Sequence, residues 1–192
     1  MTEEDNQRAQ LYRLLAGLFA RIPDREALGR IAEITGDESE LGHALSTLGQ
    51  AAAVADPARV DDEFHDLFIG VGRGELMPYC SYYLTGFVYE KPLARLRVDM
   101  DRLGIARAED VKEPEDHIAA LCEMMAGLIE GAFGDPADIG TQRAFFDAHI
   151  GPWAGQFFAD LETAKATDFY APVGAIGRIF MVIESTAFEM AA

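Results

Sequence analysis

The chain has 192 residues, of which 49% are hydrophobic and 26% are charged, and its formal net charge is −17 at pH 7. This length and apolar content are typical of a folded globular chain that needs no metal or disulfide to hold its core. The negative charge excludes direct binding to nucleic acids or anionic lipid surfaces, because the few lysines and scattered arginines form no basic patch that would offset it.

Apolar residues recur at spacings of three and four along most of the chain, which predicts helices. Pro23, Asp24 and the pair Asp56-Pro57 mark boundaries between these runs. The helices expected in chain order span about 7–21, 24–36, 38–55, 58–69, 92–104, 114–133, 141–149, 152–166 and 170–190, and helical pattern also resumes at about 82. No segment alternates with a period of two. The sequence therefore predicts an all-α, single-domain helical bundle of about nine or ten helices over residues 1–192.

Residues 70–81 interrupt the helical pattern and are predicted to form a loop. Alternating glycines at positions 70, 72 and 74 suggest a nucleotide-binding loop. However, Glu75 follows them, the preceding segment is predicted to be helical rather than a strand, and no Gly-Lys-Ser/Thr is present. These glycines are therefore interpreted as a structural turn.

The sharpest polar cluster is the run from Glu113 to His117, at the start of the helix expected over 114–133. In one interpretation, its carboxylates stabilise the positive end of the helix dipole. In the other, Asp116 and His117 line a cleft and bind a ligand. The residues alone leave both interpretations open.

The sequence gives little support for a metal site or for a catalytic nucleophile. The four histidines show no metal-ligand spacing, and Cys80 and Cys122 form no CxxC motif. His117 and Cys122 would lie on different faces of a helix, which excludes a nucleophile-base pair. We therefore expect no catalytic residue, no metal and no cofactor.

The compartment can also be predicted from the sequence. Two widely spaced cysteines favour a reducing environment, and the acidic N-terminus lacks the basic start and apolar run of an export signal. The most apolar stretch, 173–190, contains Arg178 and Glu184 and is predicted to be a core helix rather than a membrane span. We expect a cytoplasmic protein.

Six segments, taken in order, resemble the motif series of a known family. They are Tyr12-Arg-Leu-Leu-Ala-Gly-Leu-Phe19, Phe64-His-Asp-Leu-Phe-Ile-Gly70, Pro78-Tyr-Cys-Ser-Tyr-Tyr83, Glu113-Pro-Glu-Asp-His-Ile118, His149-Ile-Gly-Pro-Trp153 and Phe169-Tyr170. This series is similar to that of the TorD/DmsD family of redox-enzyme maturation chaperones. The resemblance covers about residues 8–188.

The resemblance implies a cytoplasmic chaperone without enzymatic activity. Such a protein binds the twin-arginine leader peptide, the catalytic subunit of a molybdopterin oxidoreductase, or both, and delays export until the cofactor is inserted. It acts as a monomer or homodimer, without nucleic acid and without inserting in the membrane. The implied peptide-binding residues are Phe64, Leu67, Phe68, Pro78, Tyr79, Ser81, Tyr83, Asp116 and His117.

The chemistry of such a leader agrees with this sequence. Two guanidiniums followed by an apolar helical stretch need carboxylates beside an apolar groove. Residues 99–116 hold seven acids against three bases, and aromatic residues flank the 70–81 loop. Two alternatives stay open: a helical nucleotide- or cofactor-binding protein that uses Asp116 and His117, and a helical adaptor without a peptide groove.

Overall fold

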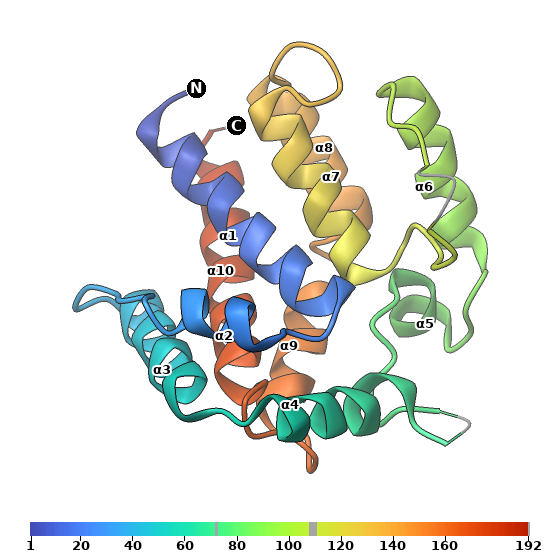
Figure 1. The fold of residues 1–192 in the computed structure, drawn as a ribbon. Coiled ribbons are helices and arrows are strands. Elements are labelled where there is room, and N and C mark those ends of the chain that lie inside the picture. Colours follow the sequence, from blue (N-terminus) through green and yellow to red (C-terminus); the bar gives the residue numbers. More distant parts are fainter. Residues whose placement is uncertain (72, 108–110, 192) are drawn as a thin grey trace. The chain divides into compact units, whose positions relative to one another are not determined.

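The computed structural model describes residues 1–71, 73–107 and 111–191 (Figure 1). These residues form ten α-helices and one π-helix, and none of them forms a strand. The helices are α1 (Glu3–Ala20), α2 (Arg25–Ile31), α3 (Glu40–Val54), α4 (Pro57–Phe64), the π-helix η1 (His65–Ile69), α5 (Cys80–Thr85), α6 (Lys91–Arg102), α7 (Ile118–Glu130), α8 (Ile139–His149), α9 (Ala154–Glu162) and α10 (Ala171–Met190). The predicted all-α fold is confirmed.

The chain divides into two compact units, each assembled from separate stretches of sequence. The first unit contains Met1–Ala20, Pro78–Trp153 and Phe188–Ala192, and the second contains Arg21–Met77 and Ala154–Ala187. That the two units together make one domain over residues 1–192 stays a prediction.

Helices α1 and α7 pack along each other in the first unit (Figure 1). The apolar stripe of each helix is buried, and neither Tyr12 of α1 nor Leu121 of α7 has exposed surface. The Arg8 guanidinium lies 5.2 Å from the centroid of the Phe188 ring. The two ends of the chain therefore meet in this unit.

Helices α9 and α10 approach closely in the second unit because glycines face the contact. A Cβ atom at Gly174 would lie 2.5 Å from the backbone nitrogen of Glu162, and one at Gly177 would overlap the ring of Phe158. Any larger residue would force the two helices apart, which interior packing does not allow without cost.

Helix α10 is long and apolar enough to cross a membrane by length and composition alone, with a mean hydropathy of 1.3. Half of this stretch is buried inside the protein, and Glu184 within it has no exposed surface. This burial fits the core helix expected from the sequence.

The helix expected over 58–69 is in fact two elements, α4 and the π-helix η1. Gly70 ends η1 with a φ of 59°, which a side chain would disfavour. The Leu76 amide then donates to the Leu67 carbonyl over 2.8 Å, so the glycine-rich segment folds back on η1. Gly72, one of the three alternating glycines, lies outside the described residues.

Helix α1 begins at Glu3, before the expected start at about 7, and α2 ends at Ile31, before the expected end at about 36. Two further helix starts differ from the expectation because of long-range contacts. Helix α5 begins at Cys80, inside the predicted loop 70–81, and α7 begins at Ile118 rather than at Pro114. His117 is the N-cap of α7, and its amide donates to the Pro114 carbonyl over 3.1 Å in a turn that precedes the helix. Long-range hydrogen bonds between these two helix starts are the physical reason for both differences.

Candidate functional site

The starts of α5 and α7 are joined by two backbone hydrogen bonds in the first unit. The Cys80 amide donates to the Asp116 carbonyl over 3.0 Å, and the Ile118 amide donates to the Pro78 carbonyl over 2.9 Å. We name this pair of contacts the α5–α7 bridge. It fixes the segment before one helix against the segment before the other.

The Asp116 side chain completes the start of α5. Its Oδ2 atom accepts a hydrogen bond from the Ser81 amide over 2.8 Å, whereas Tyr79, at the N-cap position of α5, makes no side-chain capping bond. A carboxylate at a helix N-terminus satisfies an otherwise unpaired amide and interacts favourably with the helix dipole. Asp116 is 1% exposed and Ser81 is fully buried. Within the described part of the chain, Asp116 Oδ1 and Ser81 Oγ have no hydrogen-bond partner.

Tyr79, His117 and Glu113 are adjacent at the outer side of this bridge. The rings of Tyr79 and His117 meet edge to face with centroids 5.1 Å apart, and an antiparallel bridge joins the two residues. The Tyr79 hydroxyl donates to Glu113 Oε2 over 2.5 Å. Burial raises the pKa of Tyr79, and the hydrogen bond to Glu113 raises it further, so the phenol stays a donor.

His117 caps helix α7 with its ring. Its Nδ1 atom accepts a hydrogen bond from the Ala119 amide over 3.1 Å, which requires an unprotonated Nδ1. Burial lowers the pKa of His117 to about 4, and the opposing effect of Glu113 and Asp116 is smaller. The imidazole is therefore neutral at pH 7. In this structure it acts as the N-cap of α7.

Glu115 pairs with two arginines in the same unit. Its carboxylate accepts hydrogen bonds from Arg97 Nε over 3.1 Å and Nη2 over 2.9 Å, and Arg107 Nη1 lies 3.4 Å away. Burial acts to raise the pKa of Glu115, but the hydrogen bonds and charges of the arginines outweigh it and hold the pKa below its usual value. Part of the acidic excess predicted for residues 99–116 is thus neutralised within the protein.

Tyr83 lies on α5 beside other aromatic rings of the first unit. Its ring centroid is 5.4 Å from that of Trp153 and 6.1 Å from that of Tyr82. The first unit therefore brings Pro78, Tyr79, Ser81, Asp116 and His117 into direct contact through the α5–α7 bridge, with Tyr83 on the helix that follows.

The other three predicted site residues belong to the second unit. Phe64 and Phe68 are half-buried, and their ring centroids lie 5.9 and 5.5 Å from that of Tyr170. Leu67 between them is completely buried, so it is a core residue of this unit. A groove that combines these residues with Tyr79 and Asp116 stays a prediction.

Glu63 anchors the segment before α10, and the sequence analysis missed it. Its carboxylate accepts hydrogen bonds from the backbone amides of Asp168, Phe169 and Tyr170 over 2.8, 2.9 and 2.7 Å. One signal could have indicated it: Glu63 is a charged residue four positions before Leu67, so it lies on the face that the helical pattern predicts to be buried. The contacts themselves join positions more than 100 residues apart, which no local pattern reveals.

The described residues contain no group of three or more histidine, cysteine or acidic side chains that could hold a metal ion. Both cysteines are free and buried. Burial raises the pKa of Cys80 to about 12 and raises that of Cys122 as well, so both thiols stay protonated. Neither is a suitable nucleophile.

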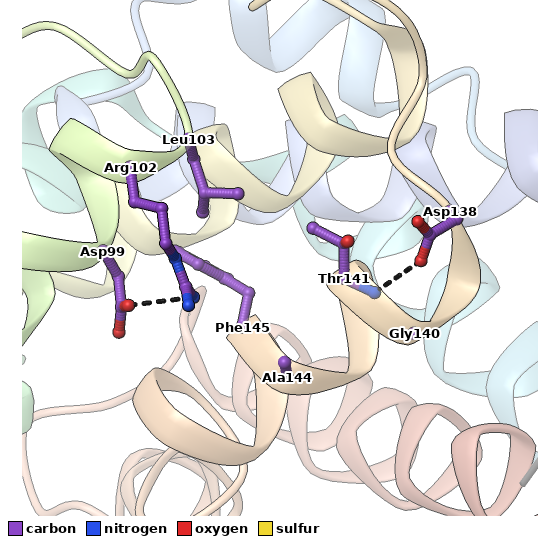
Figure 2. A pocket seen from close by; sticks show the side chains of 8 residues that line it. All are labelled: Asp99, Arg102, Leu103, Asp138, Gly140, Thr141, Ala144 and Phe145. Carbon is purple, nitrogen blue, oxygen red and sulfur yellow. Dashed lines mark hydrogen bonds and ion pairs between the residues drawn. The ribbon is translucent and has the colours of Figure 1, made fainter.

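A separate pocket of about 450 Å³ lies between α6 and α8 of the first unit (Figure 2). Its polar groups are already paired: Asp99 accepts from Arg102 over 3.0 Å and lies 2.9 Å from His149 Nε2, and Asp138 caps the Thr141 amide over 2.8 Å. Neither residue of the Asp116–His117 pair lines it. This pocket therefore gives no support to the alternative in which Asp116 and His117 bind a small ligand.

The geometry defines an all-α protein with a hydrogen-bonded polar cluster at the joined starts of α5 and α7. Residues 35–159 match the family model described as nitrate reductase delta subunit, and the chain belongs to this family. It is 24% identical over 202 residues to the chaperone protein TorD of Vibrio atlanticus, covering 94% of each chain. It is 29% identical over 145 residues to the chaperone protein TorD of Photobacterium profundum, covering 65% of each chain. The resemblance to the TorD/DmsD family is confirmed.

A solved structure shares the fold. The crystal structure of a protein described as a redox enzyme maturation protein from Archaeoglobus fulgidus matches with a TM-score of 0.59. It is 21% identical and covers 91% of this chain and 93% of its own. The fold shared with this structure therefore spans nearly the whole chain.

Proposed function

We propose that this protein is a chaperone for the maturation of a molybdopterin oxidoreductase, without enzymatic activity of its own. It binds the catalytic subunit, holds it until the molybdenum cofactor is inserted, and acts in the cytoplasm. The observation that carries the proposal is the full-length similarity to TorD chaperones, which spans 94% of both chains.

The finer part of the proposal is that the twin-arginine leader of the subunit is the segment bound. A net charge of −17 favours a cationic peptide, and the α5–α7 bridge holds Tyr79 and the exposed Glu113 together on the first unit. Half-buried Phe64 and Phe68 offer apolar surface on the second unit. These are the two kinds of surface that a leader with arginines and an apolar stretch requires.

The test is capture of a defined precursor. The tagged chain is incubated with purified, cofactor-free catalytic subunits of molybdopterin oxidoreductases from its source organism, each with and without its leader. We expect one subunit to be retained in a stoichiometric complex and leader removal to weaken retention. Failure of every subunit to bind would refute the chaperone function, and unchanged retention without the leader would refute only leader recognition.

The alternative of a nucleotide- or cofactor-binding protein has weaker support. Asp116 is 1% exposed and bonded to the Ser81 amide, and His117 Nδ1 is bonded to the Ala119 amide. Neither group is presented to a small molecule in this arrangement.

A further inference from the structure

Helix α6 gathers basic side chains in a chain that is strongly acidic. Four of the 16 lysines and arginines fall within its 12 residues, against two acids. No basic patch was expected from the sequence, because these residues are not consecutive in the chain. The helix brings them together, since residues three and four positions apart share a face. The local charge of α6 is therefore opposite to that of the whole protein.

Lys91, Arg95, Val98 and Arg102 form one exposed stripe along α6, which we name the α6 stripe. Their spacing of four, three and four residues places them on the same helix face, and all four side chains are exposed. The other side of the helix is apolar and buried, and α6 packs against α5 and α8 of the first unit. The stripe therefore has no packing role in this unit.

Most of the positive charge on the α6 stripe is not neutralised within the protein. Arg102 lies 3.0 Å from Asp99, but its side chain is still 69% exposed. Lys91 and Arg95 form no ion pair with any residue that the structure describes. These cations are therefore open to a negatively charged partner.

Apolar and aromatic surface accompanies the cations. Val98, in the middle of the stripe, is 69% exposed, and Phe87 and Tyr89, in the segment that joins α5 to α6, are each 70% exposed. Tyr89 has a φ of 64°, the one positive value outside glycine in the described part of the chain. Aromatic residues and arginine are enriched where proteins bind one another. This mixture therefore suits a polypeptide partner.

Charge limits which partner can use the α6 stripe. A leader with two arginines would be repelled by it, because the charges are alike. Nucleic acids and anionic membranes are extended polyanions, so the net charge of −17 repels them at long range. The stripe is about 16 Å long, from the rise per residue of an α-helix. A short acidic segment of a protein matches this length and carries few charges to be repelled elsewhere.

We propose that the α6 stripe is a docking surface for an acidic, partly apolar segment of a partner protein. Carboxylates of the partner pair with Lys91, Arg95 and Arg102, and an apolar side chain of the partner packs on Val98. The inference goes beyond the proposed function, because it concerns a second surface and does not depend on recognition of the leader.

Calorimetry with the full chain and two synthetic helical peptides tests this proposal. One peptide carries three glutamates and a leucine on one face, in the order that matches the stripe, and the other has these glutamates replaced by glutamine. We expect the glutamate peptide to bind more tightly. Lys91→Gln combined with Arg95→Gln should weaken its binding about tenfold, as expected for the loss of two exposed ion pairs, and should leave the glutamine peptide unaffected.

Arg25→Gln combined with Arg59→Gln is the matched control. Both arginines are exposed on helices of the second unit, and this pair of changes removes the same net charge. The affinity for the glutamate peptide should stay unchanged. Amide chemical shifts of the wild-type chain locate the contact without any variant, and the largest changes should fall within residues 91–102.

Three results would overturn the proposal. The first is equal affinity for the two peptides, or equal losses in the α6 variant and in the control. The second is a set of shift changes centred outside α6. The third is tighter binding of duplex DNA, or of vesicles that contain phosphatidylserine, than of the glutamate peptide, which would assign the stripe to a different class of partner.

Discussion

The side chain of Asp116 does for α5 what local capping residues do for several other helices. Asp24, Ser39 and Asp56 cap α2, α3 and α4 from the position directly before each helix. These caps can be predicted from the sequence because donor and acceptor are two or three residues apart. Asp116 caps from 35 residues away, so its role as an internal acceptor could not be predicted.

The pKa of His117 leads to a prediction about stability. Its folded value of about 4 lies below its ordinary value of 6.5, so the unfolded chain takes up a proton first as the pH falls. The contribution of His117 is therefore complete above pH 6.5 and is lost toward pH 4. Protonation would also end the bond from Ala119 and place a positive charge at a helix N-terminus.

We expect His117→Asn, which keeps a capping acceptor without titrating, to flatten this pH dependence. Between pH 7 and pH 5, the wild type should lose up to about 2 kcal/mol more unfolding free energy than the variant. Urea unfolding at the two pH values measures the difference. His43→Asn, at an exposed histidine, should behave like the wild type. Equal losses in the wild type and His117→Asn would contradict the account.

Leu67 shows why burial must be known before a binding residue is tested. Its side chain has no exposed surface, so Leu67→Ala should leave a cavity and destabilise the protein by about 2–5 kcal/mol. Thermal unfolding measures this cost. A loss of peptide binding in that variant would report on folding, whereas the half-buried Phe68 is the better position for testing a groove. A folded Leu67→Ala protein of unchanged stability would show that this packing is wrong.

At the scale of elements, sequence periodicity predicted most helices, but long-range contacts decided where several of them begin. Helix α6 follows the expected 92–104 closely, because Gly104 with a φ of 71° ends it locally. The start of α5 depends on hydrogen bonds to the distant segment before α7, and η1 bonds to the glycine-rich segment that folds back on it. Neither feature could be predicted from helical periodicity. The site residues were predicted from the family resemblance. Their contacts with one another could be seen only in the structure.

The segment between α9 and α10 depends on two carboxylates. Glu63 accepts from three consecutive amides, and Glu75 accepts from the Lys165 and Ala166 amides over 2.9 and 3.1 Å. Acceptors placed in this way supply the hydrogen bonds that an irregular backbone segment otherwise lacks. They also fix Tyr170 beside the Phe64 ring.

We expect Glu63→Gln to loosen this segment. Glutamine replaces one accepting oxygen by a donor that faces backbone amides, so the protein should lose about 2–3 kcal/mol of unfolding free energy. Urea unfolding measures the loss, and hydrogen exchange should be faster at residues 168–170. Asp62→Asn, at an exposed neighbour, should change neither measurement. Unaltered exchange in Glu63→Gln would rule out this anchoring role.

For the whole molecule, the net charge of −17 is an argument about association rather than about fold. The charge of Glu115 is already paired with Arg97 and Arg107, so the field that a cationic partner meets comes from the remaining exposed acids. A long-range attraction of this kind should speed encounter with an arginine-bearing peptide.

We expect leader affinity to fall several-fold as salt rises from 0.1 M to 1 M, because the Debye length shortens from about 10 Å to about 3 Å. Apolar contacts should persist, so binding should not vanish. Calorimetry across the salt series measures this affinity. A control peptide in which both leader arginines are replaced by glutamine should show a weaker salt dependence. Identical salt dependence for both peptides would mean that the arginines do not sense this charge.

The measurement that tests the central claim most directly is the molybdenum content of the enzyme that this protein serves. The partner subunit identified by capture is produced in cells with and without the chain, and the metal bound per exported enzyme is determined by elemental analysis. The chaperone account predicts a high molybdenum content with the chain present and a clear drop without it. Equal molybdenum content in the two cultures would contradict it.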